Sequence, residues 1–134
     1  MDTNVANKDK IIYKELSYKV CGLCFEVHNQ LGRYRNEKQY ADALEHILKA
    51  NQLNYKREFA IPTSFSGELE RRNIVDFLIE DVVVLDTKAK TILTKEDYFQ
   101  MQRYLASANK KLGILVNFRQ KYLSPKRVIN NKIL

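Results

Sequence analysis

The sequence predicts an α/β fold, with a central mixed β-sheet flanked by helices. Three observations support this class. Segments with apolar residues at three- and four-residue steps, typical of helices, occur before and after a group of β-branched segments. Residues 73–90 contain two apolar, β-branched strands around a short polar turn near Glu80 and Asp81. Residues 112–118 form a continuous apolar run, typical of a strand buried on both faces, and a helical segment separates this run from the hairpin.

Two helices are expected before the strands. The first covers residues 15–31 and ends at Gly32, a natural helix C-cap. Its apolar side chains recur at helical spacing: Leu16, Val20, Leu23, Val27 and Leu31. The second helix covers residues 37–50. Glu37 stands in its first turn, where the helix dipole stabilises a carboxylate, so capping is one interpretation of this residue and a functional role is the other.

The remaining elements complete the mixed sheet. Residues 54–65 are typical of a strand, in which Pro62 indicates an edge position or a bend. After the hairpin, Thr94 is a natural N-cap for a helix over residues 95–108. Residues 126–130 add a short edge strand. The predicted sheet therefore combines a three-stranded meander, a crossover helix and a further strand.

The chain of 134 residues is expected to hold a single domain over residues 15–134, behind a frayed polar tail at residues 1–14. Its polar start is unlike a secretory signal peptide. No apolar run approaches the roughly 20 residues of a membrane-spanning helix. We therefore expect a cytoplasmic protein with no membrane partner.

The formal net charge of +7 favours a negatively charged partner. Basic residues occur in small groups, among them Arg33 with Arg35 and Arg71 with Arg72. A basic surface attracts a phosphate polymer, partly because binding releases counterions. The other interpretation is a solvated charged surface, and charge alone leaves both open.

A C-x-x-C pattern lies in the first helix, at Cys21 and Cys24, with His28 one turn later. A zinc site needs about four ligands, and the chain has no second pair of Cys residues. A redox-active pair is expected at a helix N-terminus, whereas this pair is in the middle of a helix. We interpret both Cys residues as small apolar core residues, and His28 as a polar residue at the edge of the core.

Three charged residues interrupt the hairpin strands: Asp76 in the first, and Asp86 and Lys88 in the second. Burying an ionised group costs several kcal/mol unless it is paired or bound to a metal. The three charges therefore form either a costly ion cluster or a functional site.

The register of the hairpin decides whether the two acids meet. A two-residue turn would pair Asp76 with Leu85, which leaves the two Asp side chains on opposite faces. A turn that is one residue longer places Asp76 opposite Asp86. It also gathers an apolar face of Val75, Phe77, Ile79, Val83 and Leu85. We therefore predict the longer turn, with the like charges balanced by a divalent cation and by Lys88.

This residue set suits the hydrolysis of phosphodiesters. Two carboxylates can hold Mg²⁺, which contacts a phosphate oxygen and lowers the pKa of a bound water. A neighbouring Lys can orient that water and offset negative charge on the phosphorus.

An acid on a helix, an Asp on one strand and (D/E)-x-K on the next strand form the signature of the PD-(D/E)XK nuclease-like superfamily. The chain resembles this superfamily, and more narrowly the GxxExxY family within it, over roughly residues 15–130. The matching segments are EVHNQLG at 26–32, EKQY at 37–40, DFLIED at 76–81, VLDTK at 84–88 and LGILVNF at 112–118, together with Gln100, Tyr104 and Leu105. The resemblance implies a restriction-endonuclease-like core.

The resemblance also implies a role for each matching residue. Glu37 would be the helix acid that reaches the metal or its waters, and Asp76 and Asp86 would be metal ligands. Lys88 would be the catalytic lysine, and Gln100 would contact substrate or orient a ligand. The implied cofactor is Mg²⁺ or Mn²⁺.

Further expectations concern the substrate. Nucleic-acid contacts are expected at Arg33, Arg35, Tyr40 and Tyr104, and Tyr34 stands where the GxxExxY pattern has Gly. DNA is favoured over RNA as partner, and the small size favours a homodimer or a second protein that supplies specificity. The alternative function is a binding module on the same fold, for nucleic acid or protein, with little or no catalysis.

Overall fold

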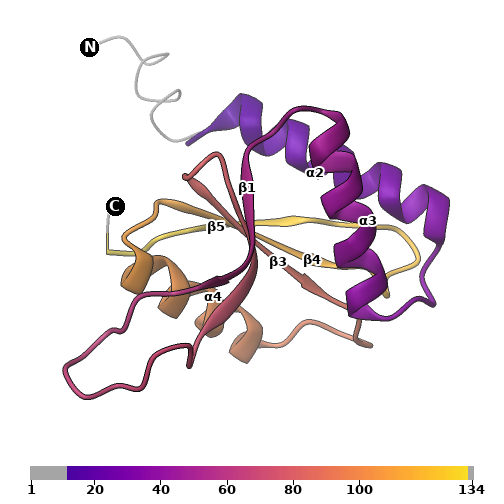
Figure 1. Cartoon of the computed structure of the whole chain (residues 1–134). Coiled ribbons are helices and arrows are strands. Elements are labelled where there is room, and N and C mark those ends of the chain that lie inside the picture. The colour runs from indigo at the N-terminus through magenta and orange to yellow at the C-terminus, as the bar shows by residue number, and fades with distance from the viewer. Residues whose placement is uncertain (1–11, 133–134) are drawn as a thin grey trace, which may run out of the picture.

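The computed structural model describes residues 12–132, which form one five-stranded sheet and three helices (Figure 1). The elements are α2 (Lys14–Leu31), α3 (Glu37–Ala50), β1 (Tyr55–Ala60), β2 (Ile74–Ile79), β3 (Val83–Lys88), α4 (Lys95–Ala108), β4 (Leu112–Asn117) and β5 (Lys126–Ile129). None of these helices has the length and apolar character needed to cross a membrane. Most of the tail expected at residues 1–14 lies outside the described residues.

The sheet is mixed and its strand order follows the sequence, β1-β2-β3-β4-β5. Strands β1, β2 and β3 form an antiparallel meander, β4 runs parallel to β3, and β5 is antiparallel to β4. Helix α4 makes the crossover between β3 and β4. The predicted α/β class, with a meander, a crossover helix and a further strand, is therefore confirmed.

Helices cover both faces of the sheet, which gives the molecule two hydrophobic cores. Helices α2 and α3 pack on one face, where Leu44, Phe77 and Ile114 are buried. Helix α4 packs on the other face, where Met101 and Leu105 are buried. Figure 1 shows this layering, with α2 and α3 on one side of the strands and α4 on the other.

Most element boundaries follow local sequence signals. Helices α3 and α4 have the predicted ends, and both begin with a capping box. Strand β1 is an edge strand, as Pro62 indicated, but it ends at Ala60 rather than at residue 65. The N–H of Ile61 still reaches the carbonyl of Asn73, whereas Pro62 has no N–H to continue the ladder.

The β2–β3 hairpin has the predicted longer turn. Ile79 pairs with Val83 and Phe77 with Leu85, so the same register places Asp76 opposite Asp86. Glu80 and Asp81 have positive φ angles of 50° and 60° in this turn. Local backbone geometry therefore brings the two strand acids to neighbouring positions.

One residue of the expected apolar face lies elsewhere. Phe77 and Ile79 face α2 and α3 as expected, but Val75 packs in the core beneath α4. The pairing of β1 with β2 skips the position where Glu58 would oppose Asp76, and Glu58 has a positive φ of 52°. This local break in the ladder interrupts the alternation of side chains along β2.

Candidate metal-binding and catalytic site

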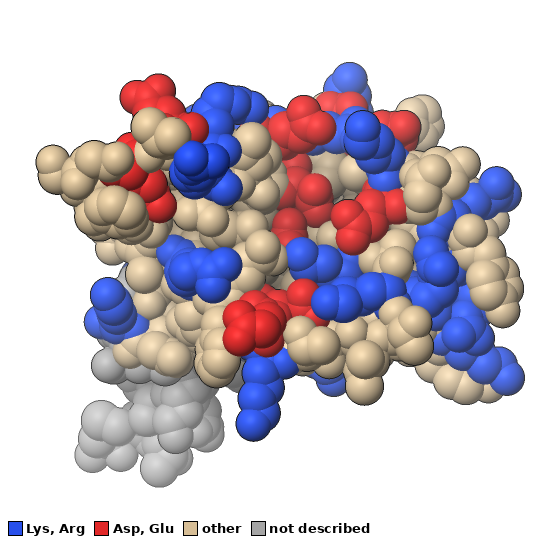
Figure 2. Space-filling view, turned by 90° about the horizontal axis from the view of Figure 1, so that it is seen from below, with Lys and Arg blue, Asp and Glu red and all other residues tan. Residues whose placement is uncertain are grey.

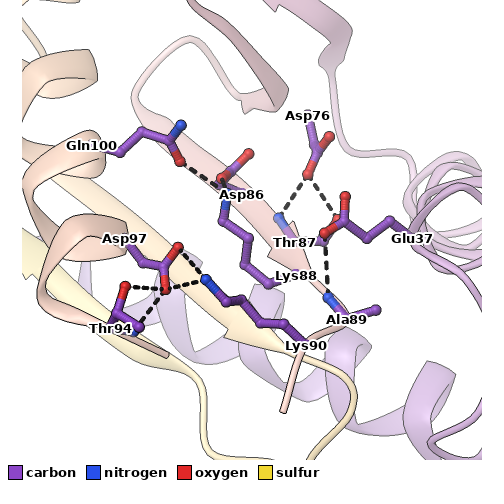
Figure 3. A network of polar contacts seen from close by, with 10 residues as sticks. All are labelled: Glu37, Asp76, Asp86, Thr87, Lys88, Ala89, Lys90, Thr94, Asp97 and Gln100. Atoms are coloured by element: carbon purple, nitrogen blue, oxygen red, sulfur yellow. Dashed lines mark hydrogen bonds and ion pairs between the residues drawn. The ribbon is translucent and has the colours of Figure 1, made fainter. Parts of the chain in front are cut away.

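The two strand acids lie at the centre of the site. Asp86 on β3 is buried, with 6% of its surface exposed, and Asp76 on β2 is half-buried. The Oδ2 atom of Asp76 accepts hydrogen bonds from the backbone N–H and the hydroxyl of Thr87, both at 2.7 Å (Figure 3). Thr87 thus fixes the orientation of the Asp76 carboxylate beside Asp86.

The environment of Asp86 disfavours its ionised form. Burial is the largest cause and the negative charge of Asp76 is the next, and together they raise the pKa of Asp86 to about 7. Lys88 opposes this shift, because its Nζ lies 3.1 Å from Oδ2 of Asp86. One ammonium does not fully compensate two neighbouring carboxylates, so the pair favours an additional cation.

Lys88 is held between β3 and α4. Its Nζ donates a hydrogen bond to Oε1 of Gln100 at 2.9 Å, in addition to the ion pair with Asp86. Burial alone would lower the pKa of Lys88, but the Asp86 carboxylate outweighs burial and raises it. Lys88 is therefore a positively charged donor in a defined orientation.

Glu37 reaches the end of β3 from the start of α3. Asn36 caps this helix, and its side chain accepts a hydrogen bond from Gln39 N–H. Glu37 is thereby free to accept a hydrogen bond from Ala89 N–H at 3.3 Å. Its side chain is exposed and stands at the rim of the site.

The donor set fits a hard divalent cation held partly by water. Within residues 12–132 no three His, Cys, Asp or Glu side chains gather closely enough to form a metal cage. Mg²⁺ does not require such a cage, because proteins commonly bind it through one or two carboxylates, with waters and substrate phosphates as the other ligands. Asp76 and Asp86 could supply the two carboxylates, because a cation between them would offset the repulsion of their like charges.

A second group of polar residues connects the segment after β3 to the start of α4. The Lys90 Nζ lies 2.9 Å from Asp97 at the start of α4, and Asp97 also accepts hydrogen bonds from Thr94. Although burial raises the pKa of Asp97, the Thr94 and Lys90 donors lower it below the ordinary value. These contacts join the segment after β3 to α4, the helix that carries Gln100.

Asn117 makes a second clamp on the same segment. It is 1% exposed, and its side chain both accepts from Lys90 N–H and donates to the Lys90 carbonyl. In the parallel pairing of β3 with β4, Asn117 stands beside Lys88. Sequence analysis did not single out Asn117, although a lone amide ending an apolar strand is a signal for a buried hydrogen-bonding role.

Tyr40 and Tyr104 are buried, with 0% and 4% exposure, so neither ring presents a surface to nucleic acid. The Tyr40 hydroxyl donates to the Gly32 carbonyl at 2.6 Å and accepts from Arg35 N–H. Burial, with a smaller contribution from Asp86, raises the pKa of Tyr104 to about 12. Tyr40 belongs to the core beneath α2 and α3, and Tyr104 to the core beneath α4.

The two Cys residues of the C-x-x-C pattern have the properties of core residues and not of metal ligands. Cys24 is fully buried in the α2–α3 core, Cys21 is half-buried, and both are free thiols. Burial raises the pKa of both thiols, which disfavours the thiolate that a metal would need. Nε2 of His28 lies 2.8 Å from the carbonyl of Gln120, so His28 has a structural partner.

Comparison with known proteins identifies the family. The family model of the PD-(D/E)XK nuclease superfamily matches residues 14–129, so the chain belongs to this superfamily. No curated protein shows a significant sequence match. The crystal structure of SSO0001 is similar with a TM-score of 0.53 and 21% sequence identity, over 69% of this chain. The match spans 48% of the SSO0001 chain, and it supports the fold alone.

Proposed function

We propose that the protein is a metal-dependent nuclease that hydrolyses phosphodiester bonds in nucleic acid. One observation carries the proposal: Asp76 and Asp86 adjoin the last pair of the β2–β3 ladder, close enough for the charge of Asp76 to raise the pKa of Asp86, and Lys88 is ion-paired to Asp86 at 3.1 Å. This is the arrangement of acids and lysine expected for the superfamily to which the chain belongs. We also propose that the chain is a member of the narrower GxxExxY family.

In this proposal Asp76 and Asp86 would hold Mg²⁺ or Mn²⁺, and Glu37 at the rim would reach the metal or its waters. The chemistry that such a metal supplies is polarisation of a phosphate oxygen and activation of a water. The raised pKa of Asp86 favours this assignment, because a neighbouring cation would relieve the cost of its negative charge.

Lys88 and Gln100 act on the substrate side. The charged ammonium of Lys88 orients the attacking water and stabilises negative charge that develops on the phosphoryl oxygens. Gln100 accepts a hydrogen bond from that ammonium, so it fixes the position of Lys88. The substrate is nucleic acid, with DNA favoured, and a homodimer would enlarge the contact surface of this small chain.

Single-turnover cleavage tests the proposal. Labelled single- and double-stranded DNA and RNA are incubated with the protein in Mg²⁺, Mn²⁺, Ca²⁺ or EDTA. We expect cleavage in Mg²⁺ or Mn²⁺, little in Ca²⁺, and none in EDTA. Lys88→Ala should lower the rate by about 10²–10³ while metal binding persists. Lys95→Ala, which removes an exposed Lys of α4, is the matched control and should cleave at the parental rate.

Two outcomes would contradict the nuclease. Cleavage that survives EDTA, or Lys88→Ala cleavage at the parental rate, would show that this site does not perform the reaction. Salt-sensitive binding with no cleavage of any substrate would instead support a binding module on the same fold.

A further inference from the structure

Two surface loops meet beside the site and are tied to each other. The loop at residues 32–36 joins α2 to α3, and the loop at residues 118–125 joins β4 to β5. Arg33 Nε donates to the Arg119 carbonyl at 2.9 Å, and Arg119 Nη2 donates to the Arg35 carbonyl, also at 2.9 Å. These reciprocal bonds fix the position of each loop relative to the other.

A buried aromatic pair anchors both loops to the core. The Tyr40 ring stacks on Phe118, with centroids 4.4 Å apart and planes 9° from parallel. The Tyr40 hydroxyl bonds to the first loop at Gly32 and Arg35, while Phe118 begins the second loop. Surface loops are usually mobile, but these contacts tie both loops to each other and to the core.

Each of the two loops carries one exposed tyrosine. Tyr34 is 81% exposed and Tyr122 is 80% exposed. The Arg33 guanidinium carbon lies 5.4 Å from the ring centroid of Tyr34, and the Lys121 Nζ lies 5.4 Å from the ring centroid of Tyr122. A single exposed aromatic residue is ordinary, but each of these rings carries a cation, and the two loops that bear them are locked together.

The loops lead directly into the candidate site. The first loop is followed by Glu37, the first residue of α3, and the N–H of Phe118 donates to the carbonyl of Lys88 at 2.9 Å. Figure 2 shows acidic side chains in the middle of this face, and Lys and Arg side chains gathered at the side where the two loops lie in Figure 1. Because Glu37, the rim acid of the site, directly follows the first loop, a nucleic-acid strand bound on these loops would lie next to the site.

We propose that this surface binds unpaired nucleotides of the nucleic-acid substrate and guides them to the site. We call it the tyrosine patch, formed by Arg33, Tyr34, Arg35, Arg119, Lys121 and Tyr122. Bases stack on the two exposed rings, while the patch cations contact the phosphates. The proposal rests on the proposed function, because it names the form of nucleic acid that the same protein binds.

Stacking on the patch requires a single strand. In a duplex the base faces are covered by neighbouring bases, so exposed tyrosine rings cannot reach them and only the cations contribute. Unpaired bases offer free faces, and each base–aromatic contact then adds to the affinity without demanding a particular sequence. The patch is therefore expected to distinguish unpaired from paired nucleic acid, and to discriminate weakly among sequences.

The test is fluorescence anisotropy with a labelled oligothymidylate and a labelled duplex, measured in Ca²⁺ with the full chain. We expect the double variant Tyr34→Ala/Tyr122→Ala to bind the single strand about 10- to 100-fold more weakly. Duplex affinity should change less than about 3-fold, because the cations remain. Tyr34→Phe/Tyr122→Phe should bind like the parent, since a phenyl ring still stacks. Tyr18→Ala, which removes an 83% exposed ring on α2, is the matched control.

The failures of the two proposals are distinguishable. Unchanged single-strand affinity in the double Ala variant, or an equal loss for both ligands, would overturn the tyrosine patch even if the parent cleaves DNA. Selective single-strand loss in a parent that cleaves nothing would support the patch and count against the nuclease. Circular dichroism melts of each variant separate loss of binding from loss of folding.

Discussion

The buried carboxyl group of Asp86 should make the metal-free protein less stable as pH rises. Its pKa of about 7 in the folded chain, against an ordinary value of 3.8, is a difference of about three pH units. At 1.36 kcal/mol per unit, the ionised carboxylate costs about 4 kcal/mol of folding free energy. The pKa is raised, so this cost is absent below about pH 4, grows between pH 4 and 7, and is complete above pH 7.

The variant Asp86→Asn removes that cost and keeps the shape of the side chain. The cost of about 4 kcal/mol is already net of the attraction of Lys88, but an amide fits the site of a carboxylate imperfectly, so we expect a net gain of about 2–3 kcal/mol at pH 8. For a domain of this size the melting temperature should rise by about 5–10 °C. At pH 4 the gain should be close to zero, because Asp86 is then protonated in the parent.

The assay is thermal denaturation in EDTA from pH 4 to pH 8, followed by circular dichroism. Glu96→Gln removes an exposed carboxylate of α4 and should change stability by less than about 1 kcal/mol, with little pH dependence. Adding Mg²⁺ should raise the melting temperature of the parent and leave Asp86→Asn unchanged. A variant that is less stable than the parent at pH 8 would refute the reasoning, because Asp86 would then be a satisfied partner of Lys88.

Three further perturbations have expected outcomes. Replacing Cys21 and Cys24 together by Ala should cost about 1–3 kcal/mol in urea denaturation and leave metal content unchanged, and stoichiometric zinc that disappears with the substitution would contradict the core interpretation. Arg35→Ala should make the slope of log binding constant against log salt concentration for duplex DNA shallower by about one unit. An unchanged slope would show that Arg35 does not contact a phosphate. Asn117→Ala should destabilise the chain by about 1–3 kcal/mol, because it leaves Lys90 N–H and C=O unpaired, and a neutral effect would mean that water replaces the amide.

The hairpin shows how much of the site local sequence can specify. Of the two turns considered, only the longer one places Asp76 opposite Asp86, and the apolar face that it gathers on the hairpin favoured it. The observed pairing of Ile79 with Val83 has that register. The starts of α3 and α4 were also predictable from short-range hydrogen bonds, because the Asn36 side chain accepts from Gln39 N–H and the Asp97 carboxylate accepts from the N–H and hydroxyl of Thr94.

Features that depend on distant or unusual geometry were not predictable. Val75 faces α4 because the β1–β2 ladder breaks at Glu58, and a positive φ at a glutamate has no sequence signal. Asn117 on β4 bonds to Lys90, which follows the neighbouring strand β3 and lies 27 positions away in the chain. Tyr40 matches the family pattern, but the pattern does not show that its ring is stacked inside the core.

The two buried aspartates near Lys88 show why geometry, more than residue type, assigns a role. Asp97 and Asp86 have similar exposure, 7% and 6%. Asp97 accepts hydrogen bonds from the backbone and hydroxyl of Thr94 and from Lys90, so its charge is satisfied and its pKa is lowered. Asp86 has the ammonium of Lys88 and faces a second carboxylate, so its pKa is raised. A buried carboxylate whose charge is balanced by hydrogen bonds and an ion pair, such as Asp97, has a structural role. A buried carboxylate that lacks such compensation, such as Asp86, has the properties expected of a metal ligand.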